Sequence, residues 1–172
     1  MAENKVRERV YISGEDQYLF GQGTHYEIYK KLGAHPCKKG KTDGVFFAVW
    51  APNAAEVYVI GEFNNWNESA SRMERIGNGG IYTTFIEGAK EGQLYKYMLV
   101  LSDGRRLYKA DPYANYAEMR PGTASRIYDL NHFKWSDKKW LTERDKKDMN
   151  KEPMSVYECH IGSWMKHPDG TE

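Results

Sequence analysis

Residues 45–66, VFFAVWAPNAAEVYVIGEFNNW, decide the fold of this chain. They contain two short runs of β-branched and aromatic residues, VFFAVW and VYVI, and runs of this kind are typical of strands. Pro52-Asn53 lies between the runs and Asn64-Asn65 follows the second, so residue types that favour turns end each run. The stretch therefore predicts two strands separated by a turn.

The same pattern continues outward to residue 130. Four further runs of this kind are IYTTFI (81–86), LYKYMLVL (94–101), RRLYK (105–109) and RIYDL (126–130). Turn residues stand between them and no helical segment intervenes, so the sequence predicts an all-β fold, an antiparallel β-sandwich. Asp103-Gly104 predicts a two-residue hairpin turn with positive φ at both residues, which would pair residues 94–101 with residues 106–109.

The segment before residue 44 is expected to hold one short helix. HYEIYKKLGAHP, residues 25–36, has apolar residues near helical spacing, and Gly33 and Pro36 would end the helix. We therefore assign residues 1–43 to an N-terminal segment and residues 44–132 to the sandwich.

The character of the sequence changes after residue 132. Residues 133–153 mix both signs of charge and are expected to form a linker that contacts a surface through Trp135 and Trp140. MSVYECHIGSWM, residues 154–165, is an apolar run after a proline, and it predicts a strand for which the following sequence offers no partner. Residues 154–172 are therefore assigned to a separate C-terminal piece.

Composition and cysteine usage narrow the classes of function. The chain has 25 Lys and Arg against 24 Asp and Glu, so no global charge attracts nucleic acid or an anionic membrane. Cys37 and Cys159 lie far apart, and no run of about eighteen apolar residues occurs, which predicts a cytoplasmic protein without a membrane span. The histidines lack metal-ligand spacing and no glycine-rich phosphate loop follows a strand, so neither a metal nor another cofactor is expected.

Trp66 and Lys96 are the candidate binding residues. An indole exposed in a turn loses the favourable free energy of burial unless it packs on the core or contacts a ligand such as a sugar ring. Asn64 and Asn65 could form hydrogen bonds with the hydroxyls of such a ring. Lys96 interrupts an apolar strand face, where it either binds a ligand or extends its ammonium into water. The residues alone leave both alternatives open at both positions.

Acid–base catalysis is not predicted. Glycoside chemistry needs two carboxylates close together in a cleft. The carboxylates that qualify by type are Glu62, Asp103, Asp111, Glu118, Asp129 and Glu158. Nothing in their spacing brings two of them together, so each is expected to be structural or solvated, and no catalytic residue is assigned.

A series of longer strings resembles a known family. In order, HYEIYKKLGAHP, FFAVWAPNAAEVYVIGEFNNW, EGQLYKYML, YKADPYA, EMRPGTASRIYDL, FKWSDKKW and SVYECHIGSW resemble the N-terminal portion of glycogen (1,4-α-glucan) branching enzymes. The resemblance covers nearly the whole chain. It implies an immunoglobulin-like carbohydrate-binding module of family forty-eight, followed at Ser155–Trp164 by the first strand of a family-thirteen glycoside hydrolase (β/α)8 barrel, here a truncated stub.

The resemblance also implies a function. Such enzymes transfer an α-1,4 glucan segment to a 6-hydroxyl and so form the α-1,6 branches of glycogen, but their catalytic carboxylates would lie beyond Glu172. The chain alone is therefore expected to be inactive. Its expected partners are an α-glucan (glycogen, amylose or a maltooligosaccharide) and the catalytic barrel, against which residues 111–113 and 119–123 would dock.

Trp66 and Lys96 match positions that bind glucan in related modules. The sequence departs from the family pattern at two places, because a second tryptophan is missing near Arg105-Arg106 and an asparagine is missing near Ser125-Arg126. The alternative is a free-standing regulatory or interaction module. It is disfavoured because such a module has no use for an unpaired strand at residues 154–165.

Overall fold

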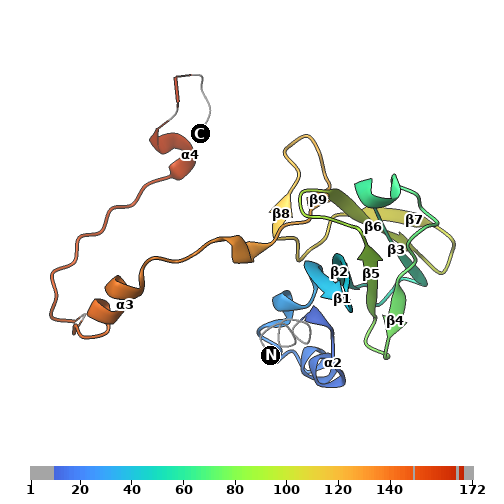
Figure 1. The fold of residues 1–172 in the computed structure, drawn as a ribbon, viewed down its shortest axis with the longest axis horizontal. Coiled ribbons are helices and arrows are strands. Elements are labelled where there is room, and N and C mark those ends of the chain that lie inside the picture. Colours follow the sequence, from blue (N-terminus) through green and yellow to red (C-terminus); the bar gives the residue numbers. More distant parts are fainter. Residues whose placement is uncertain (1–9, 149, 166, 169–172) are drawn as a thin grey trace. The chain divides into compact units, whose positions relative to one another are not determined.

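The structure is a computed structural model that describes residues 10–148, 150–165 and 167–168. The chain divides after His132 into two units, which are treated separately here. The first unit is a sandwich of two antiparallel sheets, with an N-terminal segment beside it (Figure 1). None of the helices in the described residues is long and apolar enough to cross a bilayer.

The two sheets of the sandwich have different strand orders. The first sheet has the order β1-β2-β5-β4, with β1 Gly33–Lys39, β2 Thr42–Trp50, β5 Ile81–Glu87 and β4 Glu74–Ile76. The second sheet has the order β3-β6-β9-β8, and β7 also pairs with β6. Its strands are β3 Glu56–Gly61, β6 Leu94–Val100, β7 Arg106–Lys109, β8 Tyr116–Ala117 and β9 Ser125–Arg126. The predicted all-β, immunoglobulin-like antiparallel sandwich is confirmed.

The Asp103-Gly104 hairpin forms, but with a different turn. β6 and β7 pair, as predicted, in the register Val100↔Arg106, which is one residue away from the register that a two-residue turn would give. Gly104 has a φ of +83°, whereas Asp103 is not among the described residues with positive φ. Leu101 N donates to Arg105 O at 2.9 Å, so residues 102–104 make a three-residue loop that needs only one left-handed residue, and glycine supplies it.

The core between the sheets is rich in aromatic residues. Phe47, Tyr95 and Tyr97 are almost completely buried, and their rings meet edge to face at 5.2 Å (Phe47–Tyr95) and 5.8 Å (Tyr95–Tyr97). Asp111 lies among them, and its Oδ2 accepts hydrogen bonds from Tyr95 Oη at 2.6 Å and Tyr97 Oη at 3.2 Å. Burial raises the pKa of the Asp111 carboxyl, which the two tyrosine bonds and the Tyr113 N–H counteract. The residue therefore crosslinks the interior and is not exposed for docking.

A second apolar cluster covers the outer face of the first sheet. Side chains of the N-terminal segment, among them Ile28 and Leu32, pack on Phe46, Ala48 and Ile81 of β2 and β5. β2 therefore buries both of its faces, which explains its nearly unbroken apolar sequence. The N-terminal segment is an integral part of the first unit.

The helix predicted at residues 25–36 is wrong. Only Ile28–Lys30 form a short 3-10 turn, η1, and Gly33 already begins β1, which pairs with β2 along its whole length. Gly33 has a φ of +108°, and a Cβ there would lie 2.9 Å from Tyr113 O, so the chain turns out of the helical region at this residue. Pairing with β2 thus holds β1 in an extended form, although the spacing of apolar residues at 25–36 suggested a helix. The sandwich therefore extends into residues 33–43.

The N-terminal helix lies earlier than expected. α2 spans Gly14–Gly21, and Ser13 caps it. Asp16 N donates to Ser13 Oγ at 3.1 Å, and Ser13 N donates to Asp16 Oδ2 at 2.7 Å, which completes a reciprocal capping box.

The second unit differs from both of its predictions. Residues 138–144 of the expected linker form the short helix α3 Lys138–Arg144, in which the Arg144 guanidinium lies 5.2 Å from the Trp140 ring. Residues 154–160 have no regular secondary structure, and α4 Ile161–Trp164 follows, so the predicted strand at 154–165 is not formed. A strand needs a neighbour to take its N–H and C=O groups, and the described part of this unit supplies none. Residues 166 and 169–172 of the C-terminal piece assigned to 154–172 lie outside the described residues.

Candidate functional site

The candidate binding residues gather on the outer face of the second sheet. Along β6, Tyr95 and Tyr97 point into the core, so Lys96 and Met98 point outward. Lys96 lies opposite Ile60 of β3, and Met98 lies opposite Tyr108 of β7. A loop of residues 62–70, called here the Trp66 loop, follows β3 and is anchored on β6 and β7.

The Trp66 loop begins where β3 ends. Gly61 is followed by η2, Glu62–Asn64, and then by Asn65 and Trp66 with φ angles of 52° and 58°. These are the only described residues other than glycine with positive φ, and left-handed geometry costs an L-residue about 1–2 kcal/mol. Trp66 N donates to Gly61 O at 2.9 Å, and 38% of the Trp66 surface is exposed. The indole is thus half in water, on a strained and well-defined turn.

Asn64 holds this turn in place. Its Oδ1 accepts from Gly61 N, and its Nδ2 donates to Val59 O and to Ser71 Oγ, each at 3.0 Å. Both ends of its amide are therefore engaged inside the loop. Asn65, by contrast, is exposed beside Trp66.

Two carboxylates of the loop tie it to the sheet. Glu62 Oε2 accepts from Leu94 N at 2.8 Å at the start of β6. Glu68 accepts from Arg106 Nη1 at 2.6 Å and from Tyr108 Oη at 2.5 Å, both on β7. The Tyr108 hydroxyl, and after it the Arg106 guanidinium, hold the pKa of the Glu68 carboxyl below its ordinary value. The loop is therefore fixed across three strands.

Lys96 is half buried and its ammonium has a partner. Nζ donates to Thr123 Oγ1 at 2.7 Å, in the segment that leads into β9. Lys96 and Trp66 lie near each other in the sheet, because Ile60 faces Lys96 and the next residue, Gly61, accepts the Trp66 N–H. The ammonium remains at the surface, beside an exposed threonine hydroxyl.

Tyr108 belongs to this face and was not anticipated from the sequence. It is 47% exposed and lies two residues after Arg106, on the same side of β7. The family pattern has a second tryptophan near Arg105-Arg106, where this sequence has none. Alternation of side chains along β7 places Tyr108 on the same face as Arg106, and this was the signal that could have found it. Glu68 had no such signal, since its contact with β7 joins residues 40 positions apart.

The candidate carboxylates are engaged singly. Glu118 Oε2 accepts from Ala124 N at 2.9 Å, Asp103 binds its neighbour Arg105, and Asp129 binds Asn131. Within the described residues, no group of three or more His, Cys, Asp or Glu side chains could hold a metal ion.

Comparison with known proteins places this arrangement in a family. The model of carbohydrate-binding module 48 (isoamylase N-terminal domain) matches residues 31–114, which include Trp66 and Lys96. The chain carries a carbohydrate-binding module 48. This module begins before β1, so it includes a strand whose sequence predicts part of a helix.

Similar proteins are much longer than this chain. Over 167 residues it is 62% identical to the 1,4-α-glucan branching enzyme GlgB of Butyrivibrio fibrisolvens, a match that covers 97% of this chain and 26% of that enzyme. It is 52% identical over 155 residues to GlgB of Halothermothrix orenii, covering 90% of this chain and 25% of that enzyme. The chain thus spans about a quarter of the length of these relatives. Among solved structures, a putative α-amylase from Salmonella typhimurium matches with a TM-score of 0.47 and 24% identity, over 63% of this chain and 16% of that one.

Proposed function

We propose that the first unit binds α-glucan chains on the outer face of the second sheet, with Trp66 as the stacking platform. The observation that carries the proposal is the Trp66 ring, which is 38% exposed on a loop that Asn64 and Glu68 hold in one position. A fixed, half-exposed indole can accept the apolar face of a pyranose without first being ordered, so little conformational entropy is lost on binding.

The polar neighbours divide into two roles. Lys96 with Thr123, and the exposed amide of Asn65, are suited to bond sugar hydroxyls beside the ring. Asn64 acts indirectly in this proposal, because its amide is used to shape the loop. Tyr108 extends the aromatic surface along β7 in place of the missing second tryptophan.

We further propose that the chain serves as the N-terminal module of a glycogen branching enzyme. The high identity to GlgB proteins over nearly the whole chain supports this role, as does the binding module within it. The module would hold glycogen, amylose or a maltooligosaccharide near a catalytic barrel that the chain does not itself contain. A cytoplasmic location stays a prediction from the sequence.

The structure removes one reason to disfavour a free-standing regulatory module, because the unpaired strand expected at residues 154–165 is not formed. The branching-enzyme role is now preferred because both relatives named above match this chain beyond residues 31–114.

Retardation in a native gel that contains glycogen tests the binding site. Trp66→Ala should weaken affinity by about 5- to 150-fold, the equivalent of about 1–3 kcal/mol for an aromatic platform, by analogy with nucleobase stacking. Trp140→Ala is the matched control, since it removes an indole that is 59% exposed on α3 of the second unit. Equal retardation of Trp66→Ala and the unaltered chain would reject the site.

A further inference from the structure

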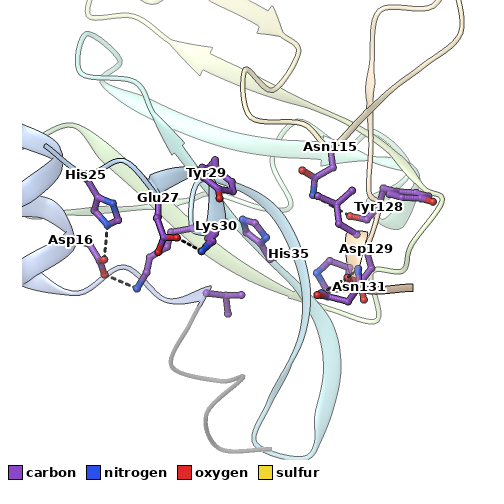
Figure 2. A pocket seen from close by; sticks show the side chains of 14 residues that line it. Asp16, His25, Glu27, Tyr29, Lys30, His35, Asn115, Tyr128, Asp129 and Asn131 are labelled. Atoms are coloured by element: carbon purple, nitrogen blue, oxygen red, sulfur yellow. Dashed lines mark hydrogen bonds and ion pairs between the residues drawn. The ribbon is translucent and has the colours of Figure 1, made fainter. Parts of the chain in front are cut away.

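A cleft of about 1170 Å3 opens between the N-terminal segment and the end of the sandwich (Figure 2). His25, Glu27 and Tyr29 line one wall, and Asn115, Asp129 and Asn131 line the other. His35 of β1 lies between the two groups in Figure 2. None of these residues belongs to the Trp66 loop or to the outer face of the second sheet.

The N-terminal wall is held rigidly by one buried carboxylate. Asp16 Oδ1 bonds His25 Nε2 at 2.8 Å, and Asp16 Oδ2 accepts from Lys31 Nζ at 2.7 Å. Burial acts to raise the pKa of Asp16, but the bonds from Lys31, Ser13 and His25 prevail and hold that pKa well below its usual range. The carboxylate is therefore ionised at neutral pH and fixes this wall relative to α2.

The opposite wall is also fixed. Asp129 Oδ1 accepts from the backbone N of Asn131 at 3.0 Å and from its Nδ2 at 2.6 Å. Asp129 N donates to Glu91 Oε1 at 3.1 Å, which ties this segment to the turn between β5 and β6. The cleft therefore exists between two ordered walls and needs no large rearrangement to admit a ligand.

The charges in the cleft are mostly paired. His25 and Lys31 are paired with Asp16, and Lys30 is paired with Glu27. Burial lowers the pKa of His35, whose Nε2 lies 2.9 Å from Leu32 O, so this ring is neutral at pH 7. Asp129 is the one lining carboxylate without an ion pair among the described residues, so the cleft disfavours anions and offers its hydrogen-bond acceptors to a ligand.

The groups facing this space suit a hydroxyl-rich ligand. Asp129 keeps its Oδ2 oxygen, and Asn115 and Asn131 keep their Oδ1 oxygens, as acceptors without a hydrogen-bond partner among the described residues. Tyr29 adds a ring that is 53% exposed at the rim. Convergent acceptors beside an aromatic face are what a sugar ring requires, and the volume exceeds the 300–1,000 Å3 usual for small-molecule pockets.

We propose that this cleft is a second carbohydrate-binding site, which takes a short α-glucan segment. The identity of the ligand rests on the function proposed above, whereas the geometry of the cleft does not. Two separate sites on one module would engage two outer chains of the same branched polymer, and the second contact would then form at high effective concentration. Affinity for glycogen would exceed that for a short oligosaccharide.

The test follows the histidine rings by NMR while maltoheptaose is added to the 172-residue chain. His25 and His35 report the cleft, and His160 of the second unit, which does not line it, is an internal reference. The titration is performed in the Trp66→Ala background, so that the outer-face site is disabled. We expect saturable shifts of His25 and His35, and a dissociation constant that rises about tenfold, within the range for an aromatic platform, when Tyr29→Ala is added.

Tyr26→Ala is the matched control, because Tyr26 is 87% exposed and does not line the cleft. Asn115→Ala is a second cleft variant, and it replaces Tyr29→Ala if a thermal melt shows that the latter disturbs the fold. Unmoved His25 and His35 signals at concentrations that saturate the unaltered protein would overturn the cleft proposal and leave the Trp66 site standing. Cleft shifts together with undiminished glycogen binding in Trp66→Ala would reject the Trp66 site and support the cleft.

Discussion

A single amide decides whether the Trp66 ring is presented. Asn64 satisfies a backbone N–H, a backbone C=O and a hydroxyl at once, and it does so beneath two consecutive left-handed residues. The sequence suggested that Asn64 and Asn65 play the same part. The structure separates them, because only coordinates reveal which amide turns inward.

Replacing Asn64 should therefore damage stability as well as binding. Asn64→Ala leaves Gly61 N and Val59 O without their side-chain partner, and an unsatisfied group of this kind costs about 1–3 kcal/mol. Urea denaturation should report a loss of about 2 kcal/mol, with weaker glycogen retardation. Asn65→Ala is the control and should keep the urea midpoint. A midpoint that is unchanged in Asn64→Ala would contradict this assignment.

The elements were predictable where pattern and pairing agree. β2, β3, β5, β6 and β7 were all expected from their composition, and the pairing of β6 with β7 was expected from the Asp-Gly turn, although the three-residue loop changes its register by one residue. β1 and the short β4 and β8 were missed. β1 carries glycine and proline, β4 carries two charged residues and β8 has only two residues, so their extended form comes from a neighbouring strand. α2 carried a readable signal, because Ser13 and Asp16 stand at capping-box spacing.

The attachment of α2 should depend on pH. Asp16 has a pKa below the 3.8 of an ordinary aspartate, so the unfolded chain takes up its proton first as pH falls. The stability that Asp16 contributes is complete at pH values well above 3.8, the pKa in the unfolded chain. It is lost progressively as the pH falls below that value. Circular dichroism melts should therefore show a steeper acid destabilisation for the unaltered chain than for Asp16→Asn, which should be less stable at neutral pH. Parallel pH profiles for the two proteins would refute this role.

At the scale of the whole molecule, the first unit has two apolar layers. One lies between the sheets, and the other lies between the first sheet and the N-terminal segment. The sequence predicted the sandwich but divided it at residue 44, because the apolar spacing of residues 25–36 suggested a helix where β1 begins. The extent of the module was decided by contacts between residues distant in sequence.

Removal of residues 1–32 should therefore expose the outer face of the first sheet. Phe46, Ala48 and Ile81 would lose their cover, and an open apolar patch of this kind promotes association. Size-exclusion chromatography should reveal oligomers, and a hydrophobic dye should bind. The matched control is a chain of residues 1–132, which keeps both layers and should remain monomeric. A monomeric, dye-silent chain lacking residues 1–32 would show that the second layer is dispensable.

The left-handed pair at Asn65 and Trp66 has one more consequence. A strained segment that is fastened from outside by a few polar bonds opens at a lower free energy than the strands beneath it. Gentle warming should then release the polysaccharide while the sandwich is still intact, so the grip on a glycogen particle would be the most heat-sensitive property of this module.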